Sequence, residues 1–428
     1  MPKPKDPGSE RTNRLENVVC PFCSLLCDDL SLDITNSSIT VAKNGCQKSK
    51  LGFEREPSID RAQIDGKRVS QKAAVTAAAR ILRRARSPLI SGLGADVEGV
   101  REAVHLAEKS KAVIDHGNST GFDQSVRVLQ SRGWYMTTLA ELRNRADLVV
   151  IVGADIVNHY ENFLRRYVTP KQSLHPERRK RRRVFYLGTK DLAPSSTKAY
   201  AIESLDCDAD GIIDVLAVLR ARIAGRIIQA AGIPRAQMRG IEALANAIKG
   251  SEYPVFVWAP GHFDGLHADL AIQVITRTID DLNQTQRAAG LALGGDNGGM
   301  SAANACAWLT GYPLHVSFAG KTLEYDPVRN RTQALIDGKE IDALVWIDAF
   351  TDTAPPATDP EVKRIVISLA GTSSATSADV FIPVGTPGVD HDGRLVRTDS
   401  VVSLRLNQVR PQIAPSVRNV VHAIVAEL

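Results

Sequence analysis

The sequence predicts an α/β protein, in which a small cysteine-bearing N-terminal lobe with a β-hairpin precedes two units built on parallel sheets. Three observations predict it. Four of the six cysteines fall within residues 20–46. Beyond them, continuous apolar runs of strand length alternate with segments of helical periodicity. At 428 residues, the chain is too long for one simple core and indicates two or three domains.

The bulk composition is that of an ordinary globular protein, with 43% hydrophobic and 24% charged residues. No run approaches the roughly twenty continuous apolar residues of a transmembrane helix. No secretory signal is recognised either, so we expect a cytoplasmic protein without a membrane partner. The start is polar and rich in proline, which predicts a disordered tail over residues 1–16.

The formal net charge is +5, and much of it sits in one basic run at residues 178–183. Such a run attracts nucleic acid or an anionic cofactor in some proteins. In others it is a solvated loop, or one that docks an acidic partner subunit. Aromatic residues make up 5% of the chain and none interleaves with the run, so we expect no nucleic-acid partner.

The cysteine motif lies in a lobe expected over residues 17–66. Cys20, Cys23 and Cys27 follow the spacing C-x2-C-x3-C, and Cys46 comes later in the chain. Four thiolates suit a [4Fe–4S] cluster or a structural zinc ion. A zinc ribbon usually pairs two C-x2-C knuckles, so the spacing favours the cluster, while thiols that bind nothing are a third reading. A disulfide is disfavoured because reducing compartments keep thiols reduced.

Two short segments in this lobe alternate apolar and polar residues, as half-buried strands do. They are Leu30–Ile34 and Ser38–Val41, and Thr35–Ser37 between them has the chemistry of a turn. We therefore expect a hairpin with the metal ligands at one end.

A first α/β domain is expected over residues 67–250. Its strongest strand is Asp147–Gly153, a continuous β-branched run of the kind buried on both faces of a parallel sheet. The other predicted strands are Pro88–Gly94, Ala112–Asp115 and Val184–Gly188, and the predicted helices are Ala73–Arg86, Val97–Ser110 and Ile212–Ile228.

A second α/β domain is expected over residues 251–428, and an alternative has its C-terminal segment return to the first. The predicted strands are Pro254–Trp258, Ala343–Ile347, Arg364–Ser368 and Val380–Pro383, with a helix at Ala268–Leu282.

A glycine-dense loop at residues 294–299 is the main candidate for binding a cofactor, through Gly294, Gly295 and Asn297. Its alternative reading is a tight connection. Neither a dinucleotide fingerprint nor a P-loop occurs. Most histidines are expected to be structural, and His159 and His391 are the two with the most suggestive neighbours.

Several segments together resemble the B-type subunit of formylmethanofuran dehydrogenase, of the molybdopterin oxidoreductase superfamily. They occur in order over nearly the whole chain: Asn17–Cys23, Leu26–Asp29, Ala112–Asp115, Asn144–Val150, Asp281–Asn283, Gly311–Pro313 and Ala378–Pro383. The resemblance implies Rossmann-like α/β units, one [4Fe–4S] cluster held by the four cysteines, and a molybdenum or tungsten pterin centre. It also implies partner subunits that use methanofuran.

The active centre of that family does not match. Gly121 and Phe122 stand where the family has a metal-binding cysteine followed by histidine. An arginine expected near the substrate is replaced within Leu293–Gly295, and the pterin clamp is replaced by Gly188–Asp191. Glycine offers no ligand and phenylalanine transfers no proton, so we expect no catalytic residues and no bound molybdopterin or tungstopterin.

That combination is similar to the B-type subunit of the bacterial formyltransferase/hydrolase complex, which serves one-carbon oxidation with tetrahydromethanopterin. There the resemblance implies a scaffold, with a methanofuran-type carrier and formate handled by partner subunits. The alternative is an active molybdenum or tungsten oxidoreductase chain. A standalone metal-binding module for nucleic acid is a third class, favoured only by the basic run.

Overall fold

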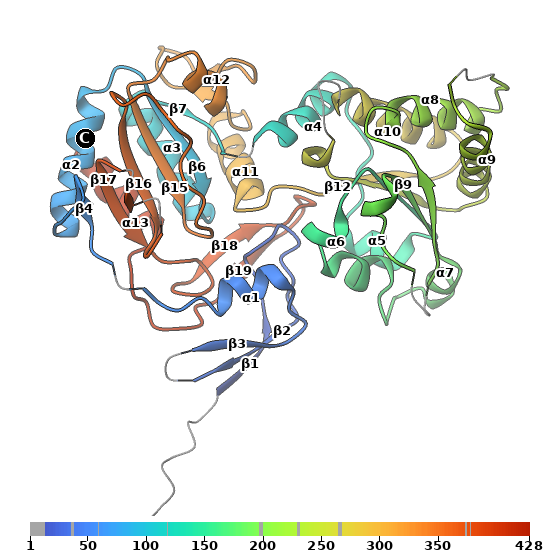
Figure 1. Ribbon diagram of the computed structural model, residues 1–428, viewed down its shortest axis with the longest axis horizontal. Coiled ribbons are helices and arrows are strands. Elements are labelled where there is room, and N and C mark those ends of the chain that lie inside the picture. Colours follow the sequence, from blue (N-terminus) through green and yellow to red (C-terminus); the bar gives the residue numbers. More distant parts are fainter. Residues whose placement is uncertain are drawn as a thin grey trace, which may run out of the picture. The chain divides into compact units, whose positions relative to one another are not determined.

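The computed structural model describes residues 13–428 except 36–37, 59, 118, 197–199, 229–231, 264–267, 373–374 and 377. The chain divides into two compact units (Figure 1). Unit 1 joins Met1–Ser119 with Gly295–Leu428, and unit 2 is the inserted segment Thr120–Gly294.

The N-terminal lobe of unit 1 is a three-stranded antiparallel sheet of order β1-β2-β3, with strands Asn13–Val18, Leu30–Ile34 and Ile39–Lys43. The predicted hairpin is therefore confirmed, although Asn36 and Ser37 of its turn lie outside the described residues. The predicted tail is wrong over residues 13–16, which belong to β1. Arg14 of β1 lies directly opposite Asp33 of β2, and their side chains pair at 2.6 Å. A cross-strand pair of opposite charge favours the strand register.

The main sheet of unit 1 has the order β14-β13-β7-β6-β15-β16-β17-β4-β5. Its five central strands, β7 to β17 in that order, run parallel, and the short outer strands pair antiparallel. The strands are β4 Gln63–Ile64, β5 Lys67–Arg68, β6 Pro88–Gly94, β7 Val113–Ile114, β13 Val316–Ser317, β14 Glu324–Tyr325, β15 Ala343–Asp348, β16 Lys363–Leu369 and β17 Val380–Val384.

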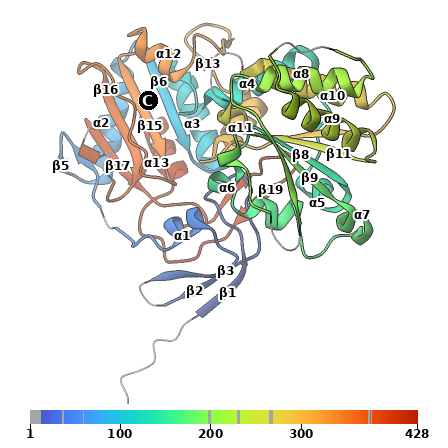
Figure 2. The same ribbon diagram turned by 45° about the vertical axis from the view of Figure 1, so that its right-hand side comes forward.

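Helices cover this sheet, and the C-terminal helix α13 packs on α2 and α3 from the first part of the chain (Figure 2). A two-stranded hairpin, β18 with β19, contributes Leu395 and Leu406 to a small core that includes Leu26 of the cysteine motif. The remaining elements are α1 Gln47–Phe53, α2 Gln71–Arg84, α3 Val97–Ser110, α11 Gly299–Thr310, α12 Thr332–Asp337, β18 Gly393–Val396, β19 Ser403–Leu406 and α13 Val417–Ala426.

Unit 2 is built on a five-stranded, entirely parallel sheet of order β10-β9-β8-β11-β12. Its core includes Val150, Phe256 and Trp258, all with no exposed surface. The strands are β8 Leu148–Val152, β9 Arg183–Gly188, β10 Ile202–Asp206, β11 Pro254–Trp258 and β12 Ala289–Ala292. The helical elements are α4 Ser119–Arg132, α5 Leu139–Arg145, α6 Ile156–His159, η1 Leu164–Val168, α7 Pro176–Arg181, η2 Lys190–Leu192, α8 Ile212–Ile223, α9 Arg235–Lys249, η3 Pro260–His262 and α10 Ala268–Leu282.

Two parallel sheets and an antiparallel N-terminal sheet confirm the α/β class, but the division of the chain differs from the sequential one. The expected boundary at residues 250–251 falls within unit 2, because β11 pairs with β8 across it. Likewise, β6 pairs with β15 although one was expected in each domain. Buried strands of either sheet have the same apolar composition, so local pattern does not specify which strands pair.

Individual elements follow the predictions closely. The bounds of β6, α3, β11 and α10 are those predicted. Helix α8 ends at Ile223, five residues before its predicted end. The physical reason is Gly225, whose φ of 74° lies in the left-handed region that terminates helices. In the part of the chain that the structure describes, no helix is both long and apolar enough to cross a membrane.

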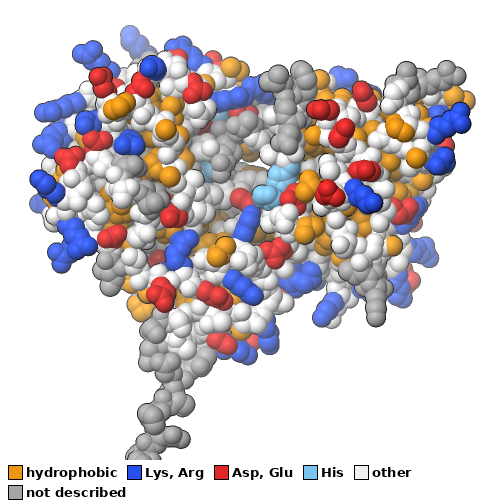
Figure 3. Space-filling model, viewed as in Figure 1, with side chains coloured by type: hydrophobic (Ala, Val, Ile, Leu, Met, Phe, Trp, Pro, Cys, Tyr) orange, Lys and Arg blue, Asp and Glu red, His pale blue; other side chains and the backbone are white. Residues whose placement is uncertain are grey.

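Most side chains of the basic run form ion pairs or hydrogen bonds within unit 2. Arg178 pairs with Glu252, Lys180 with Glu177, and Arg183 with Glu203. On the face shown in Figure 3, basic and acidic side chains are interspersed across both units.

Within this run, Arg182 makes several hydrogen bonds to backbone carbonyl groups. Its guanidinium donates to the carbonyl oxygens of Arg143, Ala146, Tyr167 and Val168 at 2.6–3.1 Å. Burial lowers the pKa of this side chain to about 10. The carbonyls belong to the ends of α5 and η1, where backbone acceptors lack helical partners. Arg182 therefore caps the C-terminal ends of two helical segments, α5 and η1.

We expect Arg182→Ala to lower the free energy of unfolding by about 3 kcal/mol, because buried carbonyls lose a charged donor. Arg181→Ala is the matched control: it removes an exposed neighbouring charge for which no contact is seen among the described residues. Urea unfolding followed by circular dichroism measures both variants. Equal midpoints would contradict the role given to Arg182.

Candidate functional site

The cysteine motif forms a closed loop in unit 1. The backbone N–H of Cys20 donates to the carbonyl of Cys27 at 2.8 Å, and that of Leu26 donates to the carbonyl of Cys23 at 3.2 Å. Leu26 takes the left-handed conformation, with φ of 45°, and its side chain is buried against the β18–β19 hairpin. The loop thereby turns the thiols of Cys20, Cys23 and Cys27 into buried surroundings.

Asp296, far along the chain, anchors this loop. One carboxylate oxygen accepts from the backbone N–H of Ser24 at 2.9 Å, and the other from Lys48 Nζ at 2.7 Å. The carbonyl of Ser24 in turn accepts from the N–H of Thr398 at 2.9 Å. The first half of the motif is therefore fixed by segments that follow unit 2 in the sequence.

The thiols lie close enough to influence one another electrostatically. The pKa of the Cys23 thiol is raised well above its usual range, first by burial and then by the negative charges of Asp296, Cys20 and Cys27. Burial lowers the pKa of Lys48, but Asp296, Cys23 and Cys46 together raise it above its ordinary value. The four cysteines thus surround one neighbourhood that also holds an ammonium group.

Cys46 reaches that neighbourhood from the N-terminus of α1. It is the N-cap residue of the helix, and its backbone N–H donates to Ser49 Oγ at 2.8 Å. Ser49 Oγ returns a hydrogen bond to the Cys46 carbonyl at 2.8 Å. This reciprocal pair fixes the backbone of Cys46 while leaving its position partly exposed.

A ligand set for a metal ion is nevertheless not assembled. Among the residues that the structure describes, no three His, Cys, Asp or Glu side chains are arranged to hold a metal. The predicted cysteines share a neighbourhood but do not form a ready-made coordination sphere in this structure.

The glycine-dense loop is tightly packed. Gly298, with φ of 76°, lies so close to Ala95 that an added Cβ would stand 2.6 Å from its carbonyl oxygen. Asn297 Nδ2 donates to the buried Asp348 carboxylate at 3.2 Å, and its backbone carbonyl lies 3.3 Å from His116 Nε2. Burial raises the pKa of Asp348 and lowers that of His116, which favours the neutral form of each.

The three predicted cofactor-binding residues are accordingly split in the fold. Gly294 ends unit 2, whereas Gly295 and Asn297 belong to unit 1. Asn297 Oδ1 is buried, and no hydrogen-bond partner for it is seen among the described residues. Of the three predicted residues, Asn297 therefore offers a side-chain acceptor, its Oδ1 atom, to a ligand or a water.

The structure also brings together histidines that are far apart in sequence. His159 follows β8 and His262 follows β11, and their ring centroids lie 4.5 Å apart. The N–H of Asp155 donates to His262 Nδ1 at 3.1 Å. This edge of the sheet, where strand order reverses between β8 and β11, is where open α/β sheets bind ligands. The sequence pattern pointed to His159 but not to its partner, because only the pairing of β8 with β11 joins them.

Gly121 has no room for a side chain. A Cβ built there would lie 2.5 Å from Gly261 Cα and 2.6 Å from Gly261 N. Both are backbone atoms, so a rotamer change cannot relieve the overlap. The first turns of α4 and η3 therefore touch through glycine at the position where the resemblance leads us to expect a metal-binding cysteine.

The two remaining cysteines are buried elsewhere. Burial raises the pKa of Cys207 to about 12, and its Sγ lies 3.3 Å from the carbonyl of Asp208. Burial also raises the pKa of Cys306, which contacts Thr310 Oγ1 at 3.7 Å. Neither favours the thiolate form that binds metals.

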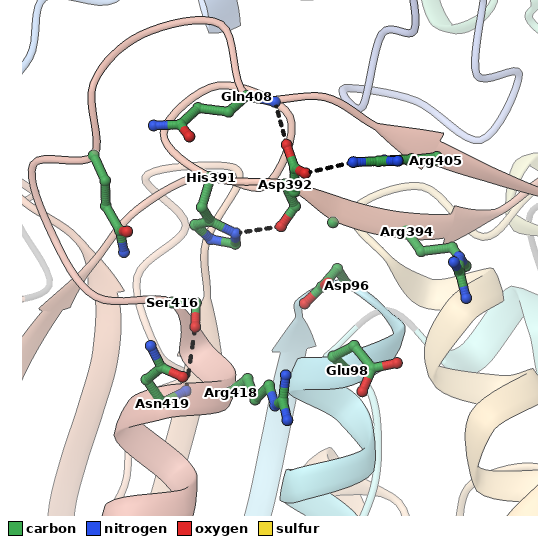
Figure 4. Close-up of a pocket in the computed structure, with 12 residues that line it drawn as sticks. Asp96, Glu98, His391, Asp392, Arg394, Arg405, Gln408, Ser416, Arg418 and Asn419 are labelled. Atoms are coloured by element: carbon green, nitrogen blue, oxygen red, sulfur yellow. Dashed lines mark hydrogen bonds and ion pairs between the residues drawn. The ribbon is translucent and has the colours of Figure 1, made fainter.

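A separate cavity of about 490 Å³ opens in unit 1 where α3, α13 and the β18–β19 hairpin meet (Figure 4). His391, predicted as a notable histidine, lines it, but both of its ring nitrogens face backbone carbonyl oxygens, those of Asp392 and Gly385. Three arginines, Arg394, Arg405 and Arg418, line the same cavity. No pattern in the sequence indicates this group, because its members come from three different elements.

Known proteins of one family resemble the chain, although no protein-family model matches it. The chain is 26% identical over 406 residues to the B-type subunit of tungsten-containing formylmethanofuran dehydrogenase 2 from Methanococcus maripaludis, with 90% of this chain and 92% of that protein covered. It is 29% identical over 340 residues to the B-type subunit of the formyltransferase/hydrolase complex Fhc from Methylorubrum extorquens, with 78% and 87% covered.

A solved structure agrees. A chain of the formyltransferase/hydrolase complex FhcABCD from Methylorubrum extorquens, solved in complex with methylofuran, superposes with a TM-score of 0.72. The sequence identity is 26%, over 85% of this chain and 98% of that chain. By its fold, the chain is an α/β protein with parallel sheets and an N-terminal lobe that carries four cysteines. Over most of its length the chain is similar to B-type subunits of formylmethanofuran dehydrogenase and of the formyltransferase/hydrolase complex.

We expect Gly121→Ala to lower the free energy of unfolding by about 2 kcal/mol, because overpacking against backbone forces the backbone to shift. Gly261→Ala is the control, since a Cβ at Gly261 meets nothing within 4 Å. Thermal unfolding by calorimetry compares the two. If Gly121→Ala is as stable as the control, the close contact of the two glycines is not present in solution.

Proposed function

We propose that the chain is the B-type subunit of a formylmethanofuran dehydrogenase-type formyltransferase/hydrolase complex in one-carbon metabolism, where it acts as a scaffold without a redox centre of its own. The observation that carries the proposal is the superposition on a chain of the methylofuran-bound FhcABCD complex, which covers 98% of that chain. Similarity over the whole length of that chain, rather than over one sheet, favours the same assembly role.

The glycine contact supports the absence of a redox centre. A metal-binding cysteine at position 121 would have to displace the backbone of Gly261, which an added Cβ already approaches at 2.5 Å. The two buried thiols elsewhere have raised pKa values and do not replace it. In this proposal the methanofuran-type carrier is bound by the complex, and formyl transfer and hydrolysis belong to partner subunits.

The second candidate is an active tungsten or molybdenum oxidoreductase chain. It is favoured by the relatives named as tungsten-containing formylmethanofuran dehydrogenase, which match 90% of this chain. It requires a metal ligand other than residue 121. His159 and His262, whose rings lie 4.5 Å apart in a tilted arrangement at the edge where the strand order reverses, are a candidate donor pair.

For the cysteines, we propose a [4Fe–4S] cluster held by Cys20, Cys23, Cys27 and Cys46 with a structural role. The spacing, the burial of three thiols and the shared electrostatic neighbourhood support it. A cluster would tie α1 to the cysteine loop, and binding energy of this kind becomes folding energy for a small lobe. Zinc is the alternative metal. Reduced thiols also fit a cytoplasmic location for the complex.

Purification of the complex tests the scaffold role. With the other subunits co-expressed, we expect the tagged chain to elute with them at fixed stoichiometry and to contain neither tungsten nor molybdenum by elemental analysis. Elution of the chain alone would contradict the assembly role. Stoichiometric tungsten or molybdenum with pterin would instead establish the second candidate.

Anaerobic metal analysis tests the cluster separately. We expect about four iron atoms per chain and a visible absorption band, both lost in Cys23→Ser, because one thiolate corner is removed. Cys207→Ser is the matched control, since that buried cysteine lies in the other unit. Zinc in place of iron, or iron unaffected by Cys23→Ser, would refute the assignment.

A further inference from the structure

The cavity of unit 1 that lies under the β18–β19 hairpin has a lining unlike that of most small-molecule sites. Its volume of about 490 Å³ is in the usual range for such sites. Every residue that lines it is charged, a polar amide or hydroxyl, histidine or glycine, and none is aliphatic. This composition of the lining favours a polar ligand.

The acidic groups of the lining are already engaged. Asp392 accepts from Arg405 at 2.9 Å and from the N–H of Gln408 at 2.8 Å. Glu98 pairs with Arg101 at 3.1 Å. Asp96 is buried and caps α3 by accepting from the N–H of Gly99 at 3.1 Å, and its burial raises its pKa. Their negative charge is therefore largely offset or satisfied within the protein.

Two of the basic groups are not engaged in this way. Arg394 of β18 and Arg418 of α13 are exposed, and no side-chain hydrogen bond or ion pair is seen for either among the described residues. Arg405 supplies a third guanidinium, held in place by Asp392. In Figure 4, Arg394 extends from the hairpin and Arg418 from the first turn of α13. Guanidinium groups from separate elements thus line one polar cavity, and this lining favours a multiply charged anion.

The two helices that border the cavity add to this preference. Both begin there, because the N-cap residues Asp96 and Ser416 line it. Ser416 Oγ accepts from the N–H of Asn419, so the N–H groups of Val417 and Arg418 are not capped by it. First-turn N–H groups of a helix bind phosphate oxygens well.

Two glutamines define the opposite part of the lining. The Nε2 atoms of Gln408 and Gln412 donate to the carbonyls of Arg410 and Ala414 at 2.8 and 2.9 Å. The Oε1 atom of each amide is an acceptor, which suits hydroxyl groups on a ligand.

We propose that this cavity binds a phosphate monoester of a hydroxylated small molecule, with the phosphate between Arg394 and Arg418 and the hydroxyls toward the glutamines. The site is independent of the cysteine lobe and of the proposed scaffold role, since none of the cysteines lines it.

Calorimetric titration of the purified complex tests this site with ribose 5-phosphate, inorganic phosphate and ribose at constant ionic strength. We expect saturable binding of one ribose 5-phosphate per chain, weaker binding of inorganic phosphate and none of ribose. Arg394→Gln and Arg418→Gln should each weaken binding at least about tenfold, as expected when a charged hydrogen bond is lost. Glu98→Gln should strengthen it, because the lining of the cavity loses one negative charge.

Arg329→Gln is the matched control, an exposed arginine of unit 1 paired with Glu340 away from the cavity. It should leave the affinity unchanged. The proposal is overturned if ribose 5-phosphate does not saturate, if the double variant Arg394→Gln/Arg418→Gln binds as well as the native complex, or if ribose competes equally. Equal affinity for inorganic phosphate would reject a monoester in favour of free phosphate.

Discussion

Unit 1 depends on the parallel pairing of β6 with β15, which joins two parts of the chain that are separated by the whole of unit 2. The other strands of the main sheet are added on either side of this central pair. The loop after β12 and the segment after β17 both contact the N-terminal lobe. Asp296 then holds Ser24 and Lys48, and α13 packs on α2 and α3. The cysteine lobe is thus stabilised by residues from the far end of the chain.

This dependence explains why the lobe is ordered although it is small. Its own three-stranded sheet buries few side chains, and its burial is completed by Leu395 and Leu406 of the β18–β19 hairpin. Small lobes of this size often need a metal or a partner surface to stay folded. Here a carboxylate and a hairpin supply part of that support, which is compatible with a structural rather than a redox role for the cysteines.

Unit 2 has the parallel-sheet architecture on which many proteins bind ligands, but backbone atoms fill the space at the position where a metal-binding cysteine was expected. The sheet reverses its strand order between β8 and β11, and the rings of His159 and His262 lie 4.5 Å apart at that edge. Yet Gly121 and Gly261 meet backbone to backbone, so the chain keeps the frame of a cofactor-binding sheet without space for a ligand side chain at residue 121.

Sequence alone determined many local elements and the family resemblance. Continuous apolar runs predicted the bounds of β6 and β11 and placed β8 to within one residue at each end, and helical periodicity predicted α3 and α10, because burial patterns are encoded over a few residues. The tertiary structure decided what is encoded over long separations: which sheet each strand joins, the contact of Gly121 with Gly261, and the cavity that Arg394 and Arg418 both line. These depend on strand pairing and close packing between distant segments, for which a local pattern of polar and apolar residues carries no information.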